Sequence, residues 1–166
     1  MQIYLRNSQK DLAISASSLR LLIAKVLEKN RIECDEISIH FVTSRKISKL
    51  HADFFDDPTT TDCITFPIGS EDGTRYKVLG EVFICPKTAI EYGKKNKKDP
   101  YEETSLYVVH GILHLLGYDD IDPKDRKQMR KKEKECMTYL KNEGALLSKK
   151  RLSKTPDEAF NDLLPP

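Results

Sequence analysis

The sequence predicts a single-domain α/β protein of the α+β type, in which a mixed β-sheet of about four strands packs with about five helices. Its 166 residues fit one domain. Four segments have the character of strands and five favour helices. Two of the strands follow each other without a helix between them, so we expect a mixed sheet rather than a purely parallel one.

The first part of the chain is expected to hold two strands and two helices. Residues 2–5 read as a short strand, and residues 36–43 as a second one in which apolar and polar side chains alternate. His40 falls on the polar face of that strand. Apolar side chains recur at helical spacing between residues 19 and 27, which predicts an amphipathic helix over 11–30. Ser44 is expected to cap a short helix that carries Phe54 and, on its surface, His51.

The second part is expected to hold strands at 62–67 and 78–85 and a basic helix at 87–97. The next helix has a clear start, with Asp99 as N-cap, Pro100 at the first position and Glu102 completing a capping box. It should run to Leu116 and stop at Gly117. A charged helix follows at about 125–142. We take residues 1–145 as the functional domain and 146–166, which lack a sustained period, as a loosely ordered C-terminal tail.

Composition excludes several classes of protein. Hydrophobic residues make up 39% and charged residues 33%, as in a soluble globular domain. The most apolar window, 106–118, is shorter than a membrane span, and residues 1–7 do not resemble a signal peptide. We therefore expect a cytoplasmic protein without a membrane partner. No Gly-rich phosphate loop is present, so no nucleotide cofactor is expected. The four cysteines are widely spaced, which favours reduced, packed thiols.

The segment at 109–120, Val-His-Gly-Ile-Leu-His-Leu-Leu-Gly-Tyr-Asp-Asp, carries the chemistry. His110 and His114 lie four residues apart, so one helix face can direct both imidazoles at one point. A left-handed turn at Gly117 would return the chain and bring Asp120 to the same point. Two nitrogens and one carboxylate with an open position describe a catalytic zinc site. Unpaired imidazoles on so apolar a helix would cost about 1–3 kcal/mol each, and a metal removes that cost.

Zinc peptidases use a similar spacing, but they need a glutamate directly after the first histidine as general base. Here that position is Gly111. A glycine in mid-helix costs about 1 kcal/mol relative to alanine, which indicates a close approach of something to the helix. The peptidase interpretation therefore lacks its proton-transfer group and is the weaker one.

The string from His110 to Asp119 resembles the signature of the YbeY family, bacterial endoribonucleases of ribosomal RNA maturation. Residues 61–67, Thr-Asp-Cys-Ile-Thr-Phe-Pro, are similar to the family's Thr-Asp-Val-Leu-Ser-Phe-Pro strand, and Leu-Gly-Glu-Val at 79–82 resembles its Leu-Gly-Asp-Ile strand. The family usually has a third histidine where this chain has Asp120. It also tends to carry an RNA-contacting arginine at the position occupied here by Phe55.

The resemblance implies a single-strand-specific metallo-endoribonuclease that acts in 16S rRNA 3′-end maturation and ribosome biogenesis, with one Zn²⁺ or another divalent metal per chain. Its partners would be single-stranded RNA, ribosomal RNA and the small ribosomal subunit. Water or the ribose 2′-hydroxyl can be the attacking group. A basic cluster, Lys94, Lys95, Lys97 and Lys98, is a candidate RNA contact, and 124–134 is a second basic run. The alternative is a non-catalytic, metal-stabilised RNA-binding assembly factor.

Overall fold

The structure, a computed structural model, describes residues 1–69 and 75–149. Within them lie the four strands and five helices that the sequence predicts. In chain order they are β1 (Gln2–Asn7), α1 (Ala16–Asn30), β2 (Glu36–Phe41), α2 (Ser44–Phe55), β3 (Cys63–Pro67), β4 (Val78–Ile84), α3 (Pro86–Asn96), α4 (Pro100–Leu115) and α5 (Pro123–Asn142).

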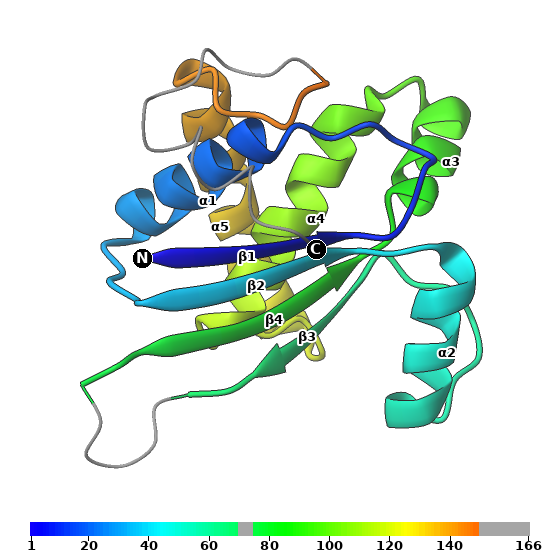
Figure 1. The fold of residues 1–166 in the computed structure, drawn as a ribbon, viewed down its shortest axis with the longest axis horizontal. Helices are drawn as coiled ribbons and strands as arrows, with labels where there is room; N and C mark the ends of the chain where they lie inside the picture. The colour runs from blue at the N-terminus through cyan, green and yellow to red at the C-terminus, as the bar shows by residue number, and fades with distance from the viewer. Residues whose placement is uncertain (70–74, 150–166) are drawn as a thin grey trace.

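The sheet has the order β1-β2-β4-β3 and is mixed, as predicted (Figure 1). β1 and β4 both pair in parallel with β2, whereas β3 runs antiparallel to β4. The antiparallel pair arises because β3 and β4 follow each other directly along the chain. β3 is thereby left at one edge of the sheet, with its outer side free to border a site.

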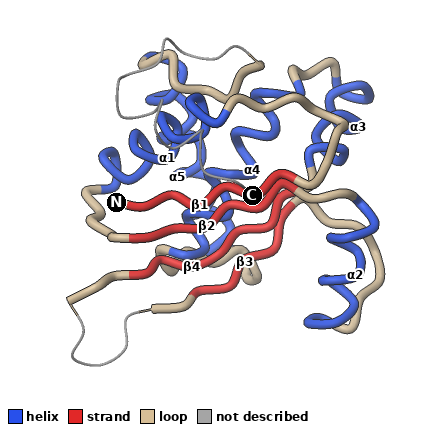
Figure 2. Tube along the Cα trace, in the orientation of Figure 1, coloured by secondary structure: helices blue, strands red, loops and turns tan. Residues whose placement is uncertain are grey.

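Helices cover the two faces of the sheet unequally (Figures 1 and 2). The side chains of β2 alternate between half-buried and buried, and Ile37, Ile39 and Phe41 point into the main core beneath α1, α4 and α5. Among the described helices, only α2 covers part of the opposite face, near β3, where Ile47 packs with Ile64 in a smaller cluster. The main core therefore lies between the sheet and α4, and α2 closes one end of the other face.

α4 lies against β3 and β4 and is buried along most of its length. A Cβ atom added at Gly111 would overlap Cγ1 of Val82 in β4. The close approach indicated by this mid-helix glycine is therefore the approach of α4 to the sheet. Because Gly111 points at β4, the position where a zinc peptidase carries its glutamate has no room for a side chain.

The ends of several elements differ from the sequence expectation. α1 begins at Ala16 rather than at 11, because Ser15 caps it and the Gln9 side chain binds the backbone of Leu12 in a loop. Thr43, not Ser44, caps α2. Asp99 caps α4 as predicted, by accepting a hydrogen bond from the backbone of the second helical residue.

Glu102, which is predicted to complete a capping box at the start of α4, pairs with α5 instead. The Glu102 carboxylate lies 2.6 Å from Nζ of Lys141 in α5, and that ion pair ties the start of α4 to the end of α5.

Packing continues past residue 145. Leu147 is buried, and its backbone N–H donates to Oγ of Ser105. The backbone N–H of Ser15 donates to the carbonyl oxygen of Ser148. Of the expected C-terminal tail, residues 150–166 lie outside the described residues. In the described part of the chain, none of the helices is long and apolar enough to cross a membrane.

We expect Gly111→Ala to lower the free energy of unfolding by about 1–3 kcal/mol, the usual cost of overpacking a core. Helix propensity alone would favour alanine by about 1 kcal/mol, so a net loss reports the contact with β4. Val82→Ala removes the overlapping methyl groups. The double variant should therefore be more stable than the sum of the two single effects predicts, by more than about 0.5 kcal/mol. Urea unfolding followed by circular dichroism measures both quantities, and strict additivity would contradict the packing argument.

Candidate metal centre

The last turns of α4 direct two imidazoles at each other. The Nε2 atoms of His110 and His114 lie 3.0 Å apart. A carboxylate oxygen of Asp120 lies 3.7 Å from Nε2 of His110, and the other lies 3.8 Å from Nε2 of His114. One ligand atom from each residue falls within 4.8 Å of the others, so the group could hold a metal ion. The structure thus brings together the three residues selected from the sequence.

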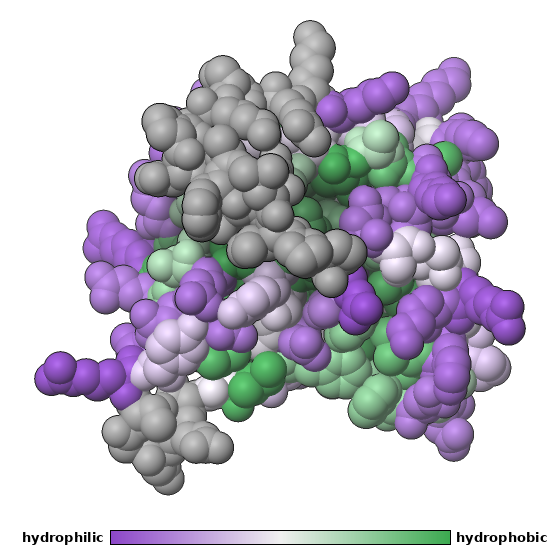
Figure 3. All heavy atoms as spheres, viewed as in Figure 1, coloured by the Kyte–Doolittle hydropathy of each residue, from purple (hydrophilic) through white to green (hydrophobic). Residues whose placement is uncertain are grey.

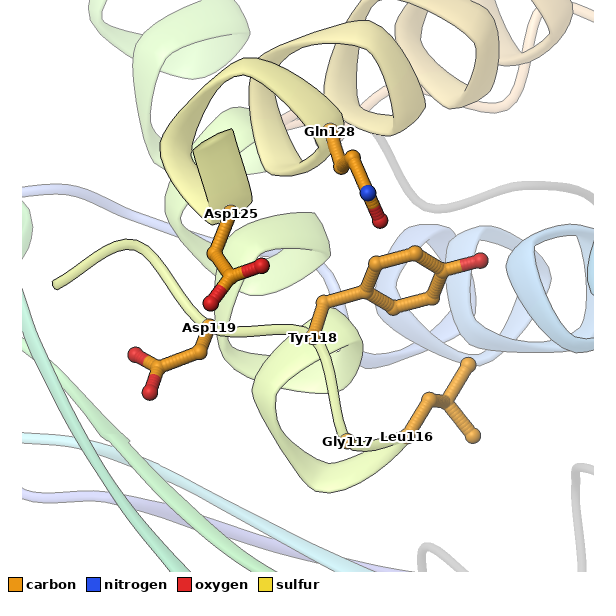
Figure 4. Close-up of a pocket in the computed structure, with 6 residues that line it drawn as sticks. All are labelled: Leu116, Gly117, Tyr118, Asp119, Asp125 and Gln128. Atoms are coloured by element: carbon orange, nitrogen blue, oxygen red, sulfur yellow. The ribbon is translucent and has the colours of Figure 1, made fainter. Parts of the chain in front are cut away.

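A turn at the end of α4 returns the chain to this point, as predicted. Gly117 has φ +92°, and its N–H donates to the carbonyl oxygen of His114 at 2.9 Å. The N–H of Tyr118 donates to the carbonyl oxygen of Leu113 at 3.0 Å, which completes a Schellman motif. Figure 4 shows the chain reversing at Gly117, with the side chains of Tyr118 and Asp119 pointing away from each other.

Two side chains hold the returning loop in place. Oδ1 of Asp119 accepts hydrogen bonds from the backbone N–H groups of Asp120 and Ile121, so this carboxylate is engaged within its own turn. Arg126, from the basic run in α5, donates from Nε and Nη2 to the carbonyl oxygens of Asp120 and Ile121, each at 3.0 Å. The position of Asp120 therefore depends on α5 as well as on the turn.

Each histidine is oriented through its other ring nitrogen. Nδ1 of His114 lies 3.0 Å from the carbonyl oxygen of Tyr118, and Nδ1 of His110 lies 2.6 Å from Oε1 of Glu133 in α5. A carbonyl oxygen and a carboxylate only accept hydrogen bonds, so both Nδ1 atoms donate. In the neutral rings both Nε2 atoms then present lone pairs to each other and to Asp120. A metal ion, or a proton on one Nε2, removes the repulsion between these lone pairs, and the arrangement matches the way proteins orient metal-binding histidines.

The electrostatics of the group favour a cation as well. Burial disfavours the charged form of His110, but Glu133, Asp62 and Asp120 outweigh it and raise the pKa of this histidine. Burial, with the same three carboxylates, also raises the pKa of the Cys63 thiol, which stays neutral and is a poor metal ligand. All four cysteines are free in the structure.

The three residues open into a cleft of about 400 Å³. It is lined by the end of α2, the segment 61–65 at the edge strand β3, the last turns of α4 and the loop 119–121. Within this cleft the carboxylate and both imidazoles are half-buried. A small substrate group from solvent can therefore reach them.

Three residues at the site escape sequence reasoning. Glu133, which binds His110, is one of many charged residues in α5 and stands 23 positions away in the chain. Asp62 belongs to the family-like segment 61–67 but received no role from the sequence, and it lines the cleft directly before β3. His51, expected only to decorate its helix, lines the cleft, and its Nδ1 lies 3.0 Å from the carbonyl oxygen of Thr59. His40, by contrast, is half-buried beside Glu81 on the open face of the sheet, as predicted.

The basic residues lie outside the cleft. Lys94, Lys95, Lys97 and Lys98 are exposed at and beyond the end of α3, where Figure 3 shows a hydrophilic surface. None of the four lines the cleft, whereas Phe55 does. Of the second run, Lys131 and Lys134 line a separate groove with Lys29 of α1.

Comparisons with known proteins agree with this architecture. A family model described as endoribonuclease YbeY matches residues 4–141. The chain is 49% identical to the endoribonuclease YbeY of Protochlamydia amoebophila over 135 residues, which cover 81% of this chain and 90% of that protein. It is 41% identical to the one from Chlamydia felis, with 89% of this chain and 96% of that protein covered.

A solved structure has a similar fold. The solution structure of a Thermotoga maritima protein superposes with a TM-score of 0.61 at 28% identity, over 86% of this chain and 91% of that one. The residues matched by the family model, 4–141, include α4 and the returning loop. The chain belongs to the endoribonuclease YbeY family.

Proposed function

We propose that this protein is a single-strand-specific metallo-endoribonuclease that acts in ribosomal RNA processing, at the 3′ end of 16S rRNA, and in ribosome biogenesis. The observation that carries the proposal is the convergence of two Nε2 lone pairs and the Asp120 carboxylate in an open cleft. The names of the relatives support cleavage of RNA as the reaction. The cytoplasm and the small ribosomal subunit are the place and partner that fit this role.

His110, His114 and Asp120 are the proposed ligands of one Zn²⁺ per chain. Two imidazoles and one carboxylate suit zinc and leave a coordination position open, although the oxygen donor also admits other divalent metals. When bound, such a metal lowers the pKa of a water molecule and polarises a phosphodiester oxygen. The chain's own contribution is orientation, because Glu133 and the Tyr118 carbonyl fix the rings and Arg126 fixes the loop of Asp120.

The RNA strand is proposed to extend from the cleft to Lys94, Lys95, Lys97 and Lys98. Their charges are exposed and lie outside the cleft, so they suit phosphates that flank the cleaved bond rather than the bond itself. The peptidase alternative receives no support, since Gly111 packs against Val82. A non-catalytic RNA-binding assembly factor is the outcome that remains if the metal binds and no RNA is cut.

The first test concerns the metal and the reaction together. The double variant His110→Ala/His114→Ala should lose stoichiometric metal, measured by elemental analysis, and should lose cleavage of single-stranded RNA. His40→Ala is the matched control, because His40 is a half-buried histidine on the other face of the sheet and should keep both properties. Chelator should stop cleavage by the wild type. One metal per chain in the double variant would falsify the ligand assignment.

Glu133→Gln tests the support of His110. The amide keeps the shape of the side chain but removes the charge that orients the ring, so we expect metal affinity to fall about 10–100-fold. Glu135→Gln, two residues further along α5, removes a carboxylate that pairs with Lys132 and should leave the affinity unchanged. Competition with a fluorescent zinc chelator measures both variants. Equal affinities in the two would show that Glu133 contributes nothing to the site.

The basic cluster is tested by salt dependence. Each phosphate contact on single-stranded RNA contributes about 0.7 to the slope of log affinity against log salt concentration. Changing Lys94, Lys95, Lys97 and Lys98 to glutamine should reduce that slope and weaken binding at low salt. Fluorescence anisotropy with a labelled single-stranded RNA gives the slope. An unchanged slope means that the cluster is only a solvated face.

A further inference from the structure

The mouth of the cleft carries two large apolar side chains that are open to solvent. Phe55, the last residue of α2, is 56% exposed, and Ile121, in the loop after α4, is 79% exposed. Both line the same cleft as the two imidazoles and Asp120, and they reach it from separate elements. Exposed apolar groups gathered beside a polar site are typical of surfaces that bind a ligand.

Both side chains stand on backbone that is held in place. The ring of Phe55 packs against His51 with ring centroids 5.5 Å apart. Nδ1 of His51 forms a hydrogen bond with the carbonyl oxygen of Thr59. Ile121 donates its N–H to Asp119 and accepts from Arg126 at its carbonyl oxygen. Preorganised apolar contacts of this kind lose little conformational entropy when a ligand binds.

The charge of the cleft excludes one way of binding a nucleotide. Among the residues that line it within the described chain, none is lysine or arginine, whereas Asp62, Asp119 and Asp120 are acidic. Attraction between basic side chains and phosphate therefore cannot hold RNA here. The group that fits beside Phe55 and Ile121 is flat, apolar on its faces and attached to a phosphodiester, which describes a nucleobase.

We propose that an unpaired nucleobase of the RNA substrate stacks on the ring of Phe55, with Ile121 against it, and so places the adjoining phosphodiester at His110, His114 and Asp120. This inference rests on the proposed ribonuclease function and specifies how that site selects its substrate. Aromatic stacking on exposed rings is a general mode of single-strand recognition. A base inside a duplex is covered on both faces, so the contact admits single strands only.

The chain contains no tryptophan, which allows a direct test of stacking. Phe55→Trp introduces a single indole at the mouth of the cleft, and binding of single-stranded oligoadenylate should quench its fluorescence. Phe54→Trp is the matched control. Phe54 is the neighbouring residue and is 61% exposed, but its ring packs against Phe66 and does not line the cleft. Chelator is present, so that the strand stays intact.

Affinity provides the second measurement. Removal of one stacking ring typically weakens binding by 1–3 kcal/mol, so Phe55→Ala should raise the Kd for oligoadenylate roughly 5- to 150-fold. Phe55→Tyr keeps the ring and should stay near the wild-type Kd, and Phe54→Ala should do the same. With metal present, Phe55→Ala should raise KM for a single-stranded substrate while metal content stays at one per chain.

The outcomes separate this inference from the proposed function. If the wild type cleaves single-stranded RNA but Phe55→Ala matches it in Kd and KM, the stacking proposal is overturned and the ribonuclease stands. Quenching in Phe54→Trp but not in Phe55→Trp overturns it as well. If the wild type cuts no single-stranded RNA with any divalent metal, the proposed function fails, whatever the fluorescence shows.

Discussion

The 3.0 Å approach of the Nε2 atoms of His110 and His114 is the interaction on which the rest of the site depends. Two lone pairs this close repel each other unless a metal ion, or a proton on one of the two nitrogens, lies between them. Glu133 and the Tyr118 carbonyl prevent the rings from turning away, because each accepts the proton of an Nδ1 atom. The fold thus holds both rings in an orientation that suits a shared cation.

The position of the two histidines depends on the close approach of α4 to the sheet. Gly111, between the two histidines, lets α4 approach Val82 of β4, and that approach places the histidines at the level of the edge strand β3. The free edge of β3 then forms one wall of the cleft, and the end of α2 forms another. A larger side chain at 111 would separate the helix from the sheet and widen the site.

Charge and apolar surface are divided between regions of the molecule. The cleft gathers carboxylates, which favour a metal cation, and it offers apolar contacts at Phe55 and Ile121. Exposed lysines stand outside it, at the end of α3. Basic side chains inside the cleft would compete with a metal for Asp120. The proposed function therefore assigns long-range attraction of RNA and binding at the site to different residues, and only the former should respond strongly to salt.

The sequence by itself determined the mixed sheet, the helices and the approach of His110, His114 and Asp120. These follow from local rules, namely strand alternation, helical spacing and the left-handed turn that Gly117 permits. The sequence assigned no role at the site to Glu133, Asp62 or His51, and it did not determine which element Gly111 faces. The roles of these residues depend on contacts between elements far apart in the sequence. In α5, for example, many charged positions are equivalent in the sequence, and only one of them reaches His110. Only the tertiary structure, which packs α5 against α4 and brings the end of α2 to the cleft, decided which side chains complete the site, because contacts between distant segments leave no periodic trace in one sequence.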